Sequence, residues 1–291
     1  MPTYYVATYG SNSNNGTSPA TPWLSVAFAL GAALGTNPGL VAGDTVWIAP
    51  GTYREVITTT TLTGAASNTI KIYGDPKFTR AWTAGSAGRV RVTNYTSDSA
   101  LPTASQTLAI IGDYVDIQDL CLDGNPVNLS GPNIPAQSCL FIRGGNNSVT
   151  RCTVQTSNEG RVNAIQVHLL AGKKTCVISQ CAFLSCMPIW ISSAAQTSPF
   201  DVDVTVQDCL IIAGNDYGIV TEAATASVVG FRLYNNTVIN AVNSAIFFIN
   251  HSSTSSTTTI VRNNLIYSIR GSGIGSTSSI TITQSNNTII C

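Results

Sequence analysis

Charged side chains are scarce in this chain of 291 residues. Asp, Glu, Lys and Arg make up 10% of it, and the 14 basic and 14 acidic residues cancel, whereas charged residues usually form about 25% of a globular domain. Nucleic acids and anionic membrane surfaces are bound through clustered Lys and Arg, so we expect neither as a partner. Low charge also weakens the electrostatic repulsion between copies, which favours self-association.

Segments for export or membrane insertion are lacking too. The N-terminal MPTYYVATYG has neither the basic start nor the apolar stretch of a secretory signal, and the Ala-rich segment 25–35 is far too short to span a bilayer. The eight Cys residues show no zinc-ligand spacing. We therefore expect reduced thiols in a protein made in the cytoplasm without a signal peptide.

A helical pattern is the third absence, because no repeated stretch places apolar residues at i, i+3 and i+4. A short phrase recurs instead, for example VTRCTV at 149–154, VQDCLI at 206–211 and VRNNLI at 261–266. The fourth position of the phrase is filled in turn by Leu120, Cys152, Cys181, Cys209, Asn236, Asn264 and Asn287, at intervals of 32, 29, 28, 27, 28 and 23 residues. A period in this range is typical of repeat architectures.

Each repeat holds further short segments of alternating apolar residues, such as AIQVH at 164–168 and AIFFI at 245–249. Alternation with period 2 is typical of strands, and the linking stretches are rich in Gly, Asn, Ser and Pro. One repeat is therefore one coil of short strands, and successive coils stack as parallel strands about 4.8 Å apart. The sequence predicts an all-β protein with a parallel β-helix, right-handed because crossovers between parallel strands almost always are.

The column formed by the fourth positions has a structural interpretation. Stacked Asn side chains hydrogen-bond along a column of this kind, whereas stacked thiols fill a small apolar slot. We therefore interpret Cys152, Cys181 and Cys209 as packing residues of a structural ladder that runs from Leu120 to Asn287.

The ends of such a solenoid need covers, because they expose strand edges and core. Residues 1–42 predict an N-terminal cap with a strand, a turn-rich loop and a short helix at 24–34, and residues 43–291 form the β-helix. The last repeat phrase is interrupted at Cys291. We expect a C-terminal cap to be absent, or supplied by a partner or by chain beyond this point.

Segments at the start of the chain and in its later repeats resemble a known superfamily. YYVATYGSNSNNGTSPATPW, followed by an Ala-rich helix and GDTVWIAPGTYRE, looks like the cap and first coil of the pectate-lyase-like right-handed β-helix superfamily, and LYNNTVI and VRNNLIY resemble its later coils. That superfamily contains polysaccharide lyases, glycoside hydrolases, pectin esterases and bacteriophage spikes and fibres, so the fold does not choose the function. Its lyases pair a Lys or Arg base with Asp-bound calcium, so calcium is implied only for a lyase and otherwise no cofactor is expected.

Catalytic motifs are hard to find. The densest acidic run is Asp113, Asp116, Asp119 and Asp123. The spacing by three places Asp113, Asp116 and Asp119 alternately on opposite strand faces unless a turn intervenes, so we interpret the run as solvated turn and strand-edge carboxylates. No polygalacturonase-like series of N-T-D, D-D and G-H-G occurs.

The best candidate site is a column on the outward face of the later strands. The outward positions form a stripe of Phe141, Gln166, Trp190, Val220 and Phe247, beside which lie Arg143, His168 and Glu222. Arg143, His168 and Glu222 are the candidates for acid–base and anion-binding roles. His168 and Glu222 are two coils apart, about 10 Å, which is too far for a direct hydrogen bond.

This stripe has three interpretations: an oligomer interface, a surface covered by loops, or a glycan groove. We favour a non-catalytic structural or adhesion protein that can also bind glycan, most concretely a bacteriophage virion component such as a spike, fibre or head-decoration protein. Its expected partners are copies of itself, with a trimer favoured, or other virion proteins. The alternative is a polysaccharide lyase or glycoside hydrolase acting on an acidic polysaccharide.

Overall fold

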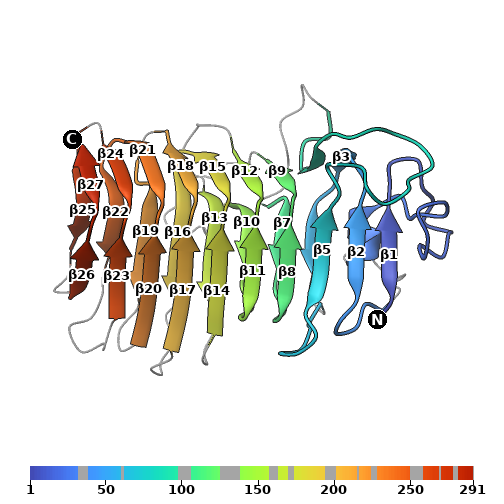
Figure 1. The fold of residues 1–291 in the computed structure, drawn as a ribbon, viewed down its shortest axis with the longest axis horizontal. Coiled ribbons are helices and arrows are strands. Elements are labelled where there is room, and N and C mark those ends of the chain that lie inside the picture. The colour runs from blue at the N-terminus through green and yellow to red at the C-terminus, as the bar shows by residue number, and fades with distance from the viewer. Residues whose placement is uncertain are drawn as a thin grey trace.

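The chain folds into a right-handed parallel β-helix, which confirms the predicted fold class. The computed structural model describes residues 1–31, 39–59, 62–97, 106–124, 138–156, 163–169, 174–193, 201–214, 216–223, 228–249, 258–268, 270–277 and 281–290. Three parallel sheets, here called A, B and C, run along the solenoid from the blue N-terminal end to the red C-terminal end in Figure 1. The chain passes from A to B to C in each coil and then returns to A.

Every strand pairs in parallel with its counterparts in the neighbouring coils. Sheet A has ten strands: β1 (Thr3–Val6), β2 (Thr45–Ile48), β5 (Ile70–Gly74), β8 (Val115–Gln118), β11 (Asn147–Thr150), β14 (Lys174–Ser179), β17 (Asp201–Gln207), β20 (Val228–Tyr234), β23 (Thr258–Arg262) and β26 (Ile282–Ser285). Sheet B has nine: β3 (Gly51–Arg54), β6 (Val90–Thr93), β9 (Cys121–Asp123), β12 (Thr153–Gln155), β15 (Ala182–Ser185), β18 (Leu210–Ala213), β21 (Thr237–Ala241), β24 (Leu265–Ser268) and β27 (Thr288–Ile290). Sheet C has eight: β4 (Ile57–Thr59), β7 (Leu108–Ile110), β10 (Ser138–Ile142), β13 (Asn163–Leu169), β16 (Met187–Ser193), β19 (Ile219–Ala223), β22 (Ser244–Ile249) and β25 (Ser272–Ser276).

The core is the inside of the solenoid, filled by the alternate residues of each strand. Val149, Ile178, Val206 and Leu233 form one such inward column in sheet A, and each is fully buried. Because side chains of a strand alternate between two faces, the remaining positions must face outward. One buried core thus extends through the coils, and the outward columns carry the surface chemistry.

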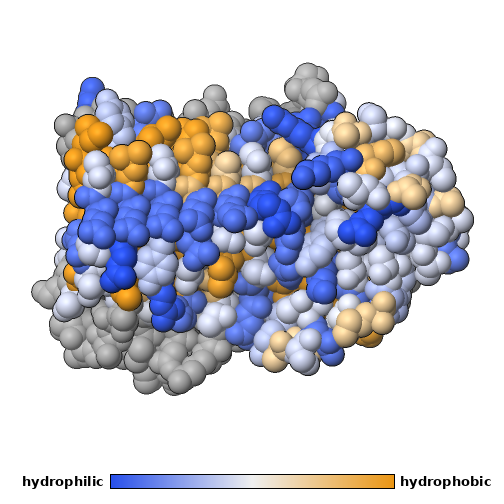
Figure 2. All heavy atoms as spheres, in the orientation of Figure 1, coloured by the Kyte–Doolittle hydropathy of each residue, from blue (hydrophilic) through white to orange (hydrophobic). Residues whose placement is uncertain are grey.

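The corner between sheets A and B is built from two residues in each repeat. The first residue adopts the left-handed conformation, with φ between 52° and 59°, which Asn and Asp tolerate better than most residues. These first residues are Asp119, Arg151, Gln180, Asp208, Asn235, Asn263 and Asn286. They leave a hydrophilic band along the line between sheets A and B, which Figure 2 shows toward the C-terminal end.

The second corner residue is the ladder residue of the repeat phrase. Asn236 donates from its backbone N–H and from Nδ2 to Oδ1 of Asn264, at 2.9 and 3.1 Å. Asn264 repeats the pattern with Oδ1 of Asn287, and its Nδ2 also donates to the carbonyl of Leu233 at 2.9 Å. Each amide therefore satisfies backbone groups of two adjacent coils inside the core.

The ladder cysteines occupy the same slot as the asparagines. The backbone N–H of Cys152 donates to Sγ of Cys181 at 3.4 Å, and Sγ of Cys181 donates to the carbonyl of Ser179 at 3.2 Å. A hydrogen bond with Cys152 and burial together raise the pKa of the Cys181 thiol, which keeps it protonated and unreactive. All seven cysteines among the described residues are free and buried; Cys291 lies outside them.

The N-terminal segment is attached to the first coil. Strand β1 pairs with β2, and the one-turn helix α1 (Val26–Ala29) begins where the Glu55 carboxylate accepts hydrogen bonds from Ser25 Oγ and the N–H groups of Val26 and Ala27, at 2.8, 3.1 and 2.6 Å. The predicted helix at 24–34 is longer than α1, and its residues 32–34 lie outside the described residues.

The ladder should dominate the stability of the corner. Asn264→Ala leaves buried backbone groups in two coils without hydrogen-bond partners. Each unpaired group costs about 1–3 kcal/mol, so we expect the free energy of unfolding to fall by about 3 kcal/mol. The neighbouring Asn263→Gly is the matched control, because Asn263 is exposed and glycine adopts positive φ freely, and it should change stability by less than about 0.5 kcal/mol. Urea unfolding of both variants measures the difference, and equal midpoints would contradict the role of the ladder.

Candidate functional site

The outward face of sheet C carries two columns of side chains in strict register. Strand pairing aligns Phe141 with Gln166, Gln166 with Trp190, Trp190 with Val220, and Val220 with Phe247. We call this set the aromatic row. The structure therefore places the five residues of the predicted stripe in one column over β10, β13, β16, β19 and β22.

The aromatic row is less exposed than an open surface patch would be. Phe141, Trp190 and Phe247 are half-buried, whereas Gln166 is 6% exposed and Val220, which lies between Trp190 and Phe247 in register, is 1% exposed. The aromatic row therefore consists of three half-buried rings separated by two buried side chains, Gln166 and Val220.

Further contacts fix the aromatic rings at both ends of this row. At the C-terminal end, Tyr217 stacks on Phe247 with ring centroids 4.7 Å apart. A Cβ at Gly275, the next position in register, would lie 2.9 Å from the Phe247 ring, so the glycine leaves space for it. At the other end, the Phe141 ring centroid lies 6.2 Å from that of His168.

Trp190 contributes an unusual group to the middle of the row. Its Nε1 is buried and has no hydrogen-bond partner in the described structure. An unpaired buried donor costs about 1–3 kcal/mol, so this N–H group destabilises the folded chain locally.

The second column of sheet C is polar and holds the three predicted catalytic candidates. Pairing aligns His168 with Ser192, and Ser192 with Glu222, so Ser192 separates the two titratable side chains. His168 Nδ1 and Ser192 Oγ lie 2.9 Å apart in a hydrogen bond. Arg143 is exposed. It lies two residues after Phe141 in sequence, next to His168 in this column and on the side opposite Ser192. We call Arg143, His168, Ser192 and Glu222 the polar row.

The protonation state of His168 follows from its surroundings. Burial, and to a smaller extent the Arg143 cation, lower the pKa of His168 below its usual 6.5. The imidazole is therefore neutral at pH 7 and can accept a proton or a hydrogen bond. Sequence reasoning identified His168, Arg143 and Glu222 but gave no role to Ser192, whose contact with His168 depends on side-chain geometry.

The acidic run predicted from the sequence does not converge on one site. The Asp119 carboxylate pairs with Arg151 at 2.7 Å and that of Asp123 with Arg91, whereas Asp116 accepts hydrogen bonds from Tyr73 and Ser148. These carboxylates bridge adjacent coils. Within the described residues, no group of three or more His, Cys, Asp or Glu side chains is arranged to hold a metal ion.

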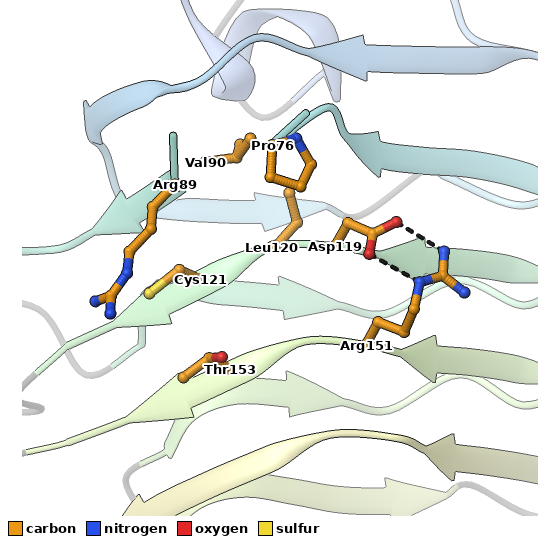
Figure 3. A pocket seen from close by; sticks show the side chains of 8 residues that line it. All are labelled: Pro76, Arg89, Val90, Asp119, Leu120, Cys121, Arg151 and Thr153. Atoms are coloured by element: carbon orange, nitrogen blue, oxygen red, sulfur yellow. Dashed lines mark hydrogen bonds and ion pairs between the residues drawn. The ribbon is translucent and has the colours of Figure 1, made fainter. Parts of the chain in front are cut away.

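A shallow pocket of about 190 Å³ lies at the corner between sheets A and B, away from the two rows (Figure 3). Asp119 and Arg151 close one side of it through two hydrogen bonds of 2.8 and 2.7 Å, while Arg89 lies on the other side beside Cys121. Burial raises the pKa of the Cys121 thiol, so this group is not an activated nucleophile.

Comparison with known proteins gives the fold. No protein-family model matches the chain, and no curated protein matches it either. A solved structure of pectate lyase Pel9A is similar over 99% of this chain and 78% of its own, with a TM-score of 0.53 and 15% identity. The fold is that of a pectate-lyase-like β-helix. The rice weevil pectin methyl esterase is also similar, over 96% of this chain and 90% of its own, with a TM-score of 0.51 and 11% identity.

At such low identities the similarity shows the fold alone and does not transfer an activity to this chain. Among the described residues, no helix is long and apolar enough to cross a membrane.

The surroundings of His168 give a prediction about pH. Because its pKa is lowered in the folded state, the unfolded chain binds the proton more readily, and the free energy of unfolding should fall as the pH drops through about 6.5. Arg143→Gln removes one cause and should raise the pKa of His168 toward its ordinary value. NMR titration measures the pKa of His168 in the unmodified protein and in Arg143→Gln, with His168→Gln to assign the signal, and urea unfolding at several pH values measures the change in stability. A pKa at or above 6.5 in the unmodified protein would contradict the lowered pKa of His168.

Proposed function

We propose that this protein is a non-catalytic, glycan-binding β-solenoid, in which an extended polysaccharide lies along sheet C over the aromatic row. The observation that carries this proposal is the register of the two rows. Aromatic rings recur along one column, while hydrogen-bonding and charged groups follow the neighbouring column.

The dimensions of the rows favour a chain ligand over a single small molecule. Phe141 and Phe247 are four strand spacings apart, which corresponds to about 19 Å along the solenoid axis. A polymer that runs parallel to this axis would meet a partly exposed ring at every second coil, at Phe141, Trp190 and Phe247.

The chemistry of the rows fits a sugar polymer. The C–H faces of sugars pack on aromatic rings, and Phe141, Trp190 and Phe247 present partly exposed rings. Sugar hydroxyls need donors and acceptors, which Ser192, His168 and Glu222 supply. Arg143 adds an exposed guanidinium that can hold the carboxylate of a uronate unit, so we propose an acidic polysaccharide.

The lack of catalysis is part of the proposal. The polar row contains one carboxylate, Glu222, whereas glycoside hydrolysis generally uses two. The virion component expected from the sequence is one setting for such a binding protein, and it stays a proposal.

Binding to immobilised polysaccharides tests this function. We expect the protein to retain at least one uronate-containing polymer from a panel of acidic and neutral glycans, and Trp190→Ala to weaken binding about tenfold or more. Trp190→Phe keeps an aromatic ring at the same position, so it should retain most of the binding if stacking on the ring holds the polymer. Val177→Ala alters an exposed apolar residue on sheet A and should leave binding unchanged. Failure to bind any polymer of the panel would overturn the proposal.

A second candidate function, polysaccharide lyase or glycoside hydrolase, is favoured by one observation. The neutral His168 beside Ser192, with Arg143 and Glu222 in the same column, supplies a base, a cation and an acid along one line.

Incubation of the protein with the same polymers, with and without calcium, distinguishes the two functions. On the binding proposal we expect no release of unsaturated or reducing ends. Release that is abolished by Glu222→Gln or His168→Ala would establish the enzyme instead.

A further inference from the structure

The outward face of sheet B changes from polar to apolar along the solenoid. Strand pairing forms one outward column across β9, β12, β15, β18, β21, β24 and β27. Its members in order are Asp123, Gln155, Leu184, Ile212, Ile239, Tyr267 and Ile290. Five consecutive coils thus place a large apolar side chain on the outside.

The adjacent column of sheet B changes in the same way. Thr153 is followed by Ala182, Leu210, Thr237, Leu265 and Thr288. No charged residue stands at any of these outward positions from β15 to β27. We define the apolar face as Leu184, Leu210, Ile212, Ile239, Leu265, Tyr267 and Ile290.

The apolar face is open to solvent, in contrast to the aromatic row of sheet C. The exposed fraction is 38% for Leu184, 40% for Leu210, 44% for Leu265, 48% for Tyr267 and 49% for Ile290. Figure 2 shows hydrophobic atoms gathered over the strands of sheet B toward the C-terminal end, directly beside the hydrophilic band. Contiguous exposed apolar patches of this kind mark interaction sites in soluble proteins.

The size of the face matches a symmetric contact. A fully exposed large side chain offers roughly 200 Å², so the five residues with the highest exposure present on the order of 400–500 Å². Burying this face against a second copy removes about twice that area, roughly 1,000 Å², which is near the lower limit for a specific protein interface.

The charge pattern indicates which partner fits. A two-fold contact brings each surface against itself, so any like charges would repel, and the apolar face carries none. Its rim toward sheet A consists of the amides Gln180, Asn235 and Asn263 and one carboxylate, Asp208, which accepts a hydrogen bond from Asn235 Nδ2 at 3.1 Å. The polar members Asp123 and Gln155 must avoid the apolar part of the partner, which they do if the two solenoids run antiparallel.

We propose that the apolar face is the contact between two copies of this chain, packed sheet B against sheet B around a two-fold axis near β21. The two solenoids run antiparallel, and their polar N-terminal halves extend past each other into solvent. The sequence predicts self-association through the stripe on sheet C, with a trimer favoured. The contact proposed here lies on sheet B instead and joins two copies. It is independent of the proposed glycan binding, because sheet C takes no part in it.

Light scattering and sedimentation of the full chain test the contact. We expect a particle of twice the 30.5 kDa chain mass at micromolar concentrations. Leu210→Lys combined with Leu265→Lys should raise the dimer dissociation constant about a hundredfold or more, because a contact would then bury unpaired charges. Both residues are solvent-exposed, so circular dichroism and thermal unfolding should match those of the unmodified chain.

Thr153→Lys is the matched control, because Thr153 is an exposed member of the same column outside the apolar face. It should leave the dimer intact. The two-fold axis has its own test: Thr237→Cys, beside the axis, should be linked to its counterpart by a short bis-maleimide crosslinker that spans the roughly 10 Å between packed sheets, whereas Thr153→Cys should not. A monomer, a trimer, or a dimer that survives both Lys substitutions would overturn the proposal.

Discussion

The structure depends on the two-residue corner between sheets A and B. At that corner a left-handed residue turns the chain, and the next residue enters the core and bonds to its counterparts above and below. Buried backbone groups must find partners, and a corner of two residues leaves the backbone few of its own. The ladder side chain supplies them, so the identity of one residue in each repeat sets the position of the whole coil.

Uniform corners give uniform register. When every coil turns at the same point, strands of neighbouring coils pair in a constant register, and an outward residue lies directly above its equivalent in the previous coil. The pairing of β21 with β24 departs from this by a register shift between Ile239 and Ala241. A single residue type repeated in the sequence then becomes a continuous surface. This is why both candidate surfaces of this protein, the rows on sheet C and the apolar face on sheet B, are columns and not clusters.

The fold can be predicted from the sequence because the ladder residues of the corner recur in it at regular intervals. Cys152, Asn236 and most of their equivalents are thiol or amide residues placed two positions before an apolar residue, at intervals of 23 to 32 residues. The outward stripe on sheet C followed from the same alignment by counting from the corner. The covering of Val220 and Gln166 could not be predicted, because it depends on how large neighbouring side chains pack across strands.

The apolar face does not follow from alternation of apolar and polar residues along a strand. Segments such as LIIA at 210–213 and LIY at 265–267 are apolar on both faces. A run of this kind resembles a buried strand, whereas here one of its faces is open to solvent. A large apolar residue at an outward strand position therefore indicates a contact with another molecule. Such positions can be recognised once the register of the strands is known.

The two proposed surfaces also complement each other. Sheets B and C are different sides of the solenoid, so a dimer formed through sheet B leaves both copies of sheet C free. In the proposed complex, each sheet C contacts the polymer over several coils, and the proposed dimer could engage the same polymer twice. Joining two sites raises the overall affinity by about 10²–10⁴-fold without any new contact, provided the ligand can reach both. A repetitive polysaccharide meets that condition by its nature, which links the neutral, self-associating face to the binding face.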